Sequence, residues 1–281
     1  MRASVVLTAL LVGVSFAGCG SAGRPTTGTR PSTPPVTANA PTTVPPAFPG
    51  STATTVAPTS IPPGTTPTPP ASPTTSTSPT TSATVLLRPG DSGPAIVSIQ
   101  ERLTALGYWL GPVDGHFGDA TEQAVYAIQK AAGLPPDGVV GPLTAGALTR
   151  GVVPHPQSTQ GRVVEVDLEH NLVMFANDGA LLYTLNTSTG GGYVYTSDGV
   201  TSVANTPRGH FSIFRQVNGM VVDSLGELWR PKYFYSGFAL HGDSYVPPEP
   251  VSHGCVRVSN EAIDWIWSAN LAPIGTALWV Y

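Results

Sequence analysis

Residues 252–257 read Ser-His-Gly-Cys-Val-Arg, and this short run places a thiol beside a candidate base. Cys255 is one of only two cysteines in the chain, and the other, Cys19, lies near the N-terminus. His253 precedes Cys255 by two positions and His241 lies further upstream. A cysteine attacks an acyl carbon as its thiolate, and a nearby histidine can take up and return the proton. The alternatives are an inert buried thiol and a zinc site, although the spacing matches no common zinc pattern.

The glycine before Cys255 adds a third element to this chemistry. Acyl transfer needs N–H donors that stabilise the negatively charged oxygen of the intermediate. Gly254 permits a tight approach of the backbone, so that its own N–H and that of Cys255 can point at one place. Residues 253–255 therefore predict a nucleophile, an oxyanion hole and a candidate base, with His253 either transferring protons or supporting the loop.

The residues around this run are predicted to form a mainly β domain over 160–281. Asp-Gly between apolar runs is a strong hairpin signal, and it occurs at Asp178-Gly179. Ser259 is a suitable N-cap for one helix over 260–268, with Glu261 in its first turn. The expected strands cover residues 162–168, 172–176, 181–185, 210–214, 238–241 and 277–281.

A smaller helical unit is predicted over residues 85–150. Asp114-Gly115 and Asp137-Gly138 are two turns of the same kind, and apolar residues at helical spacing precede and follow them.

Residues 1–84 have the composition of an export signal and a tether. Residues 1–18 combine Arg2 with a short apolar run, as in a signal peptide. Phe16-Ala17-Gly18-Cys19 follows and resembles the bacterial lipobox, which implies a lipid on Cys19; the alternative is an ordinary cleaved signal. Sixteen of the 30 prolines lie within 20–84, so we expect a disordered tether over 19–84.

Residues 85–281 suffice for two small domains and carry a mildly acidic balance. Removing Arg2, Arg24 and Arg30 from the 13 lysines and arginines of the chain leaves 10, against 17 acidic residues. This balance argues against nucleic acid as a partner. The sequence indicates no cofactor and no metal.

Residues 252–257, with His241 upstream, closely resemble the signature of bacterial L,D-transpeptidases. Thr206-Pro207-Arg208-Gly209 and Tyr235-Ser236-Gly237 match further parts of that family's pattern, and the resemblance covers 160–281. It implies that Cys255 attacks a peptidoglycan stem peptide at its third residue and forms a thioester. It also implies that an amine of a second stem then resolves this thioester and completes a cross-link.

The resemblance also assigns roles to the residues of this loop. His241 would accept and return the proton, and His253, Gly254 and Cys255 would shape the oxyanion region. Ser252, Tyr235 and Arg257 would bind substrate, where Arg257 either holds a stem carboxylate or braces the loop.

Two positions depart from the family pattern, which often has Ser where Gly242 stands and Asn where Arg257 stands. The first departure leaves open which group orients His241, and a backbone carbonyl is expected. The short spacing from His241 to Ser252 predicts a small lid.

Residues 85–150 resemble the three-helix peptidoglycan-binding domain of bacterial wall enzymes, through Gln100, Gly107-Tyr108, residues 114–118 and Gln129. The resemblance implies that Tyr108, Trp109 and Phe117 stack on sugars, and the alternative is that Phe117 and Tyr108 belong to the core. The sequence therefore predicts a monomeric, exported, lipid-anchored cell-wall L,D-transpeptidase whose partners are peptidoglycan and the membrane. The alternatives are an L,D-carboxypeptidase or a protein-anchoring enzyme with the same acyl-enzyme, a non-catalytic wall-binding module, and a cysteine protease.

Overall fold

The computed structural model describes residues 86–281, which belong to one compact unit with a helical domain and a mainly β domain. The predicted signal peptide, Cys19 and the tether over 19–84 lie outside the described residues. Within 86–281, no helix combines the length and the apolar character needed to cross a membrane. The predicted two-domain architecture is confirmed.

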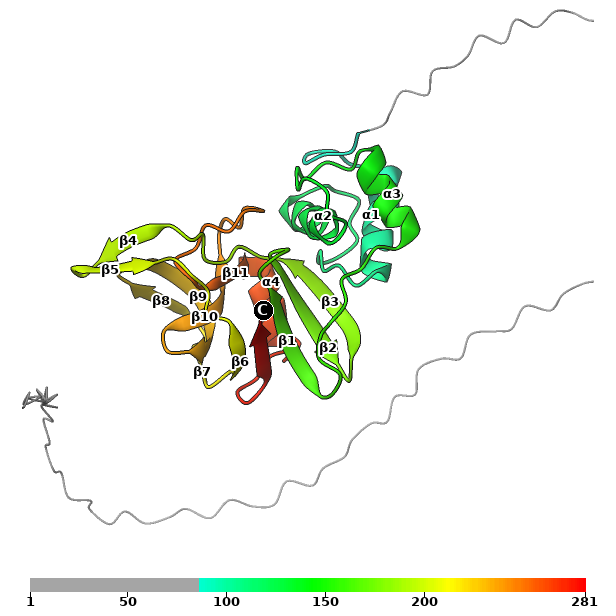
Figure 1. The fold of residues 1–281 in the computed structure, drawn as a ribbon. Coiled ribbons are helices and arrows are strands. Elements are labelled where there is room, and N and C mark those ends of the chain that lie inside the picture. Colours follow the sequence, from blue (N-terminus) through cyan, green and yellow to red (C-terminus); the bar gives the residue numbers. More distant parts are fainter. Residues whose placement is uncertain (1–85) are drawn as a thin grey trace, which may run out of the picture. The chain divides into compact units, whose positions relative to one another are not determined.

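The helical domain contains the three predicted helices, α1 (Pro94–Ala105), α2 (Asp119–Ala131) and α3 (Pro142–Arg150), which lie together in Figure 1. Proline occupies the first turn of α1 and α3, where its missing N–H costs no hydrogen bond. The apolar faces of the three helices meet around Leu103, Ile128 and Ala147, all fully buried.

A buried glutamine organises the first Asp-Gly turn. The Gln100 side chain donates to Asp114 Oδ1 (2.9 Å), the His116 carbonyl (3.0 Å) and Thr121 Oγ1 (2.9 Å). Its carbonyl accepts from the Gly115 N–H at 2.8 Å. Because these bonds join α1, the turn and α2, Gln100 fixes the position of the whole segment between the two helices.

The second turn repeats this arrangement. Gln129 donates to Asp137 Oδ1 (2.6 Å), the Val139 carbonyl (3.0 Å) and Thr144 Oγ1 (3.0 Å), and it accepts from the Gly138 N–H (3.0 Å). The repeat of the Asp-Gly turns in the sequence is therefore a repeat of hydrogen bonding as well as of turn residues.

The structure distinguishes the three aromatic residues of the segment between α1 and α2. Tyr108 and Phe117 are 1% and 2% exposed, so they belong to the core and cannot stack on a sugar. The Tyr108 hydroxyl donates to the Val152 carbonyl at 2.9 Å, which satisfies its polar end. Trp109 is partly exposed and packs against Trp265 of the β domain.

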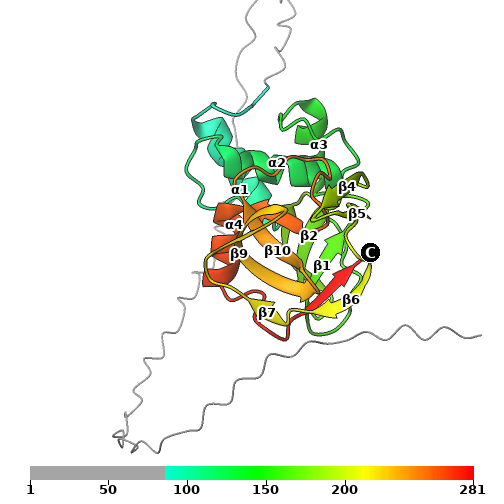
Figure 2. The same cartoon turned by 90° about the vertical axis from the view of Figure 1, so that its left-hand side faces the viewer.

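The β domain is built from two five-stranded sheets and a separate hairpin (Figures 1 and 2). In the first sheet β12 lies in parallel beside β1, and the other pairings are antiparallel. Its order is β3 (Ala180–Asn186), β2 (Leu172–Asn177), β1 (Arg162–Asp167), β12 (Ala277–Val280) and β6 (Gly209–Ser212).

The second sheet holds the strands next to the cysteine loop. Its order is β11 (Val256–Ser259), β10 (Phe238–Asp243), β9 (Gly226–Tyr235) and β7 (Arg215–Gln216), and β8 (Met220–Asp223) also pairs with β9. The core consists of side chains of both sheets and of α4 (Asn260–Ser268), among them Val164, Leu240, Ile263 and Leu278. The helix begins at the predicted N-cap, where Ser259 Oγ accepts from the Ala262 N–H at 3.2 Å.

Several strands were not predicted from the sequence. They are β7, β8, β9, β11 and the hairpin of β4 (Val194–Ser197) and β5 (Val200–Val203). The strand β9 contains Pro231, and because proline is rare inside strands, this segment was not predicted as a strand. The Asp198-Gly199 turn between β4 and β5 is a recognisable hairpin signal that the sequence interpretation omitted.

A buried lysine joins the two domains. Lys130 of α2 is 7% exposed, and its ammonium group donates to the Asn171 carbonyl (3.1 Å), the Thr187 carbonyl (3.1 Å) and Asn186 Oδ1 (2.5 Å). Burial lowers the pKa of Lys130 to about 7, while three acceptors match the three N–H donors of the charged form. Gln123 extends this contact, because its amide accepts from Asn186 at 2.7 Å.

A second lysine is buried in the β domain. Lys232 of β9 is 2% exposed and donates to Gln216 Oε1 and to the Ala272 carbonyl, both at 3.1 Å. Its ammonium nitrogen lies 3.9 Å from the centre of the Trp267 ring, a cation–π contact. Burial lowers the pKa of Lys232 to about 8.

Candidate active site

The parallel pairing of β10 and β11 places the predicted residues on one face of the second sheet. His241 lies opposite Arg257 in this pairing. Because side chains alternate along strands, Asp243 shares the face of His241, and Cys255, two positions before Arg257, shares it as well. The opposite face carries Leu240, Val256 and Val258 into the core. The same alternation that buries the core therefore presents thiol, imidazole and guanidinium together.

A backbone carbonyl orients His241, as predicted. The ring is 3% exposed, and Nδ1 lies 2.8 Å from the Gly242 carbonyl oxygen. A carbonyl only accepts hydrogen bonds, so Nδ1 carries the proton and Nε2 is left as the basic nitrogen. Burial lowers the pKa of His241, with a smaller contribution in the same direction from Arg257. The resting ring is therefore a neutral base.

The structure explains why position 242 carries glycine and not the serine of the family pattern. A Cβ at this position would lie 2.6 Å from Asn260 Oδ1 and 2.6 Å from Ile263 Cγ2, both on α4. The close packing of α4 against β10 therefore requires glycine, and the carbonyl of this residue supplies the contact to His241.

Cys255 is half-buried and lines the same cavity as His241. Burial raises the pKa of the Cys255 thiol, although a hydrogen bond from the Ala239 backbone opposes this effect. The resting pair is therefore a thiol and a neutral imidazole. Proton transfer to His241 must accompany the attack of sulfur on the substrate, because the thiolate is not formed in advance.

Ser252 organises the cysteine loop from inside. Its hydroxyl donates to the Cys255 carbonyl at 2.6 Å and accepts from the Gly254 N–H at 3.0 Å, and the side chain is 1% exposed. Both hydrogen-bonding roles of the hydroxyl are filled within the loop. This gives Ser252 a positioning role, and its assignment to substrate binding stays a prediction without a contact to support it.

The same bond changes the expected oxyanion hole. The Gly254 N–H is engaged by Ser252 Oγ, so of the two predicted donors the Cys255 N–H remains to face an oxyanion. Gly254 has φ +136°, and a Cβ there would lie 2.4 Å from Phe238 Cε1 and 2.6 Å from the Asn205 carbonyl oxygen. Glycine is therefore required at 254 for backbone conformation and for space.

Thr206 of the Thr-Pro-Arg-Gly motif braces this loop. Its hydroxyl donates to the Gly254 carbonyl at 2.8 Å and accepts from the Gly190 N–H at 3.0 Å. The sequence singled out the motif without assigning a role to its threonine. The contact explains why a segment far upstream accompanies the cysteine signature.

A cleft of about 300 Å³ surrounds the thiol. Its walls come from the β4–β5 hairpin, the β8–β9 hairpin, the turn before β10 and the cysteine loop. The lining residues are Tyr195, Asp223, Leu225, Glu227, Leu228, Ser236, Gly237, Phe238, His241, Ser252, His253, Cys255 and Arg257. The sequence analysis did not identify Tyr195, Asp223 and Glu227 as site residues, because the two hairpins that carry them were not predicted.

The remaining predicted residues lie in or beside this cleft. His253 lines it and packs edge-on against Tyr195, with ring centres 4.6 Å apart. Tyr235 is 49% exposed, packs against Phe211, and is not among the lining residues, so its assignment to substrate binding has no support from the cleft. The neighbouring Ser236 and Gly237 line the cleft instead.

Arg257 braces the two strands and also reaches the cleft, while its binding of a stem carboxylate stays a prediction. Its Nε lies 3.2 Å from Asp243 Oδ2, an ion-pair distance at an angle that makes no hydrogen bond. Each side chain keeps about a fifth of its surface exposed (21% and 22%), and Arg257 lines the cleft. The guanidinium therefore braces β10 against β11 and presents a positive charge toward the thiol. Among the described residues, no three His, Cys, Asp or Glu side chains are grouped to hold a metal ion.

Comparison with known proteins identifies both domains of the fold. Residues 161–280 match the family model described as the L,D-transpeptidase catalytic domain, and residues 92–148 match a putative peptidoglycan binding domain. Both matches lie inside the predicted ranges 85–150 and 160–281. The fold and the cysteine cleft thus define an L,D-transpeptidase catalytic domain behind a peptidoglycan-binding domain.

A solved structure extends the match to both domains. The L,D-transpeptidase of Xylanimonas cellulosilytica (its residues 123–326) is 47% identical, with a TM-score of 0.69. The match covers 71% of this chain and 98% of that one. The chain belongs to the L,D-transpeptidase family.

Curated relatives match a shorter part of the chain. A probable N-acetylmuramoyl-L-alanine amidase of Bacillus licheniformis is 43% identical over 67 residues, which is 23% of this chain and 19% of the amidase. An uncharacterized protein of Kitasatospora aureofaciens is 43% identical over 77 residues, or 27% and 60% of the two chains. The chain spans less than two thirds of the length of these relatives.

Proposed function

We propose that this protein cross-links peptidoglycan stem peptides through a thioester on Cys255. The observation that carries the proposal is the orientation of His241, whose Nδ1 donates to the Gly242 carbonyl while its basic Nε2 is left for the cleft that holds the thiol. A neutral base held in one tautomer beside a protonated thiol is the arrangement that acyl transfer to sulfur requires.

The reaction has two steps with the same proton carrier. Cys255 Sγ attacks the carbonyl carbon of the third residue of the donor stem, and its proton passes to His241 Nε2. The amide bond to the terminal residue breaks, and the leaving amine takes that proton. The side-chain amine of an acceptor stem then attacks the thioester, a new amide bond forms, and the amine proton returns through His241 to the sulfur.

The walls of the cleft supply binding and electrostatics. The Cys255 N–H is the donor proposed for the oxyanion, since the Gly254 N–H is occupied. Arg257 is the proposed partner for a stem carboxylate, and Asp243 balances its charge before substrate arrives. Asp223 and Glu227 are the proposed contacts for the positively charged amine of a stem.

The proposal is tested by incubating the protein with a disaccharide-tetrapeptide and following products by mass spectrometry. We expect loss of the terminal residue, a thioester adduct on Cys255 and a cross-linked dimer. Release of the terminal residue without a dimer would assign the carboxypeptidase reaction, in which water resolves the thioester. Absence of any adduct on Cys255, with stem peptide or with a carbapenem, would contradict the enzyme proposal.

We further propose that the protein acts as an exported monomer, attached to the membrane by a lipid on Cys19 and reaching the wall through residues 19–84. The support is the sequence pattern alone, because these residues lie outside the described part. Cys19→Ala is expected to move the protein from the membrane fraction to the soluble fraction of cells, while Cys255→Ala leaves it on the membrane. An unchanged distribution of Cys19→Ala would contradict the lipid anchor.

A further inference from the structure

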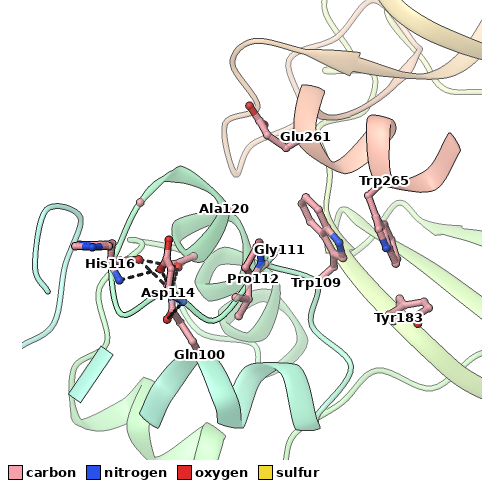
Figure 3. A pocket seen from close by; sticks show the side chains of 13 residues that line it. Gln100, Trp109, Gly111, Pro112, Asp114, His116, Ala120, Tyr183, Glu261 and Trp265 are labelled. Atoms are coloured by element: carbon pink, nitrogen blue, oxygen red, sulfur yellow. Dashed lines mark hydrogen bonds between the residues drawn. The ribbon is translucent and has the colours of Figure 1, made fainter. Parts of the chain in front are cut away.

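A second cavity, of about 570 Å³, lies where the helical domain meets the β domain (Figure 3). Ten of its thirteen lining residues fall within 92–148, the range that matches a peptidoglycan-binding domain. The other three, Tyr183, Glu261 and Trp265, come from the catalytic domain. The cavity contains none of the residues that line the cysteine cleft, so it is a separate candidate site of a size suited to a small ligand.

An aromatic stack forms one wall of this cavity. Trp109 stacks on Trp265 with ring centres 5.3 Å apart and planes at 28°, and Tyr183 packs edge-on against Trp265 at 4.7 Å. Figure 3 shows Trp109 between Trp265 and the turn of Gly111 and Pro112. Because the stack fixes its orientation, Trp109 presents a rigid apolar surface beside the cavity.

Two carboxylates provide the polar contacts. Asp114 Oδ1 accepts from the Gln100 amide and from the His116 N–H, both at 2.9 Å. The hydrogen bond from Gln100 lowers the pKa of Asp114 most, followed by the His116 N–H. Glu261, in the first turn of α4, is exposed and stands on the other side of the cavity (Figure 3).

The chemistry of the lining selects among ligands. No lysine or arginine lines the cavity, so a ligand rich in carboxylates meets Asp114 and Glu261 without compensation. A pyranose ring has an apolar C–H face that packs on an aromatic surface. Its hydroxyl and acetamido groups carry donors, which carboxylates accept well. A neutral sugar satisfies both parts of the lining.

We propose that this second cavity, called the groove below, binds a neutral N-acetylated hexosamine of the glycan strand. Trp109 is the stacking surface, and Asp114 and Glu261 are the acceptors. The proposal rests on peptidoglycan as the substrate. Since Glu261 and Trp265 belong to the catalytic domain, the glycan site is complete only when both domains are docked. The enzyme would then hold a strand at the domain junction while its stem peptide enters the separate cysteine cleft.

The experiment uses a β-1,4-linked tetramer of N-acetylglucosamine as probe and tryptophan fluorescence as readout. The expected result is a saturable change in emission, because Trp109 lies at the groove. Glu261→Gln keeps the size of the side chain and is expected to weaken binding about tenfold through loss of a charged acceptor. Glu101→Gln, an exposed carboxylate on α1 away from the groove, is the matched control and should bind as the unmodified protein does.

Further measurements separate this proposal from the catalytic one. Cys255→Ala should bind the tetramer normally, and Glu261→Gln should form the thioester with a free stem peptide at the unmodified rate. Equal affinity of Glu261→Gln and Glu101→Gln, or no saturable signal with the tetramer, would overturn the glycan site whatever the transpeptidase assay shows. Competition by the free stem peptide at this groove would assign it to peptide and also overturn the proposal.

Discussion

His241→Asn is expected to slow thioester formation by about 10²- to 10⁴-fold, the usual contribution of a positioned general base, and Cys255→Ala to abolish it. Asparagine can keep a donor near the position of Nδ1, so the bond to the Gly242 carbonyl can be retained while the basic nitrogen is removed. The loss should therefore report proton transfer rather than collapse of the loop. The measurement is the rate of adduct formation by mass spectrometry.

The pH dependence of the rate provides a second readout. Burial lowers the pKa of His241 below 6.5, so the rate of the unmodified protein should stay level through neutral pH and fall only on the acid side. In His241→Asn the residual reaction depends on free thiolate. It should rise with pH toward the raised pKa of Cys255, above 9.0. His170→Asn, at an exposed turn, is the control; a level profile in His241→Asn would contradict the assigned base.

The same shift predicts a loss of stability in acid. The folded pKa of His241 is lower than the unfolded value of 6.5, so the unfolded chain binds a proton that the folded chain excludes. This contribution to the free energy of unfolding is present above pH 6.5 and is lost as the pH falls through the lowered folded pKa. Urea denaturation at several pH values measures it.

Lys130→Met is expected to lower the free energy of unfolding by about 3 kcal/mol, because three buried acceptors lose their donor at once. The apolar replacement fills similar volume but leaves the Asn171 and Thr187 carbonyls and Asn186 Oδ1 unpaired. These acceptors belong to the β domain, so the loss should also weaken the docking of α2 against it.

Arg150→Met is the matched control, since it removes a cation from an exposed position at the end of α3. Urea denaturation gives the stability, and limited proteolysis between the domains, within residues 151–161, reports their docking. Equal stability and equal cleavage of the two variants would contradict the role assigned to Lys130.

Local signals explain what the sequence predicted well. The helix α4 was predicted at its observed bounds because Ser259 caps it and its apolar residues follow helical spacing. The cysteine loop was identified because residues 252–257 are contiguous. These features depend on neighbours in the chain, which a sequence displays directly.

One local contact and two long-range ones account for what was missed. The Gly254 N–H was assigned to the oxyanion hole, but it donates to Ser252 Oγ only two positions away, because residue types alone do not show the backbone conformation of the loop. Thr206 reaches the Gly254 carbonyl across 48 positions, and Tyr195 reaches the cleft through a hairpin that was not predicted. Such contacts depend on how distant strands pack, and no spacing in the chain encodes them.

The burial of both lysines has a consequence for a protein whose proposed reaction consumes amines. Lys130 and Lys232 are the only lysines in the sequence, and their amino groups donate to acceptors inside the fold. The folded part therefore offers no lysine side chain to its own thioester or to that of a neighbouring copy. Self-acylation has no lysine nucleophile there, and amine-reactive labels should leave residues 86–281 unmodified until they unfold.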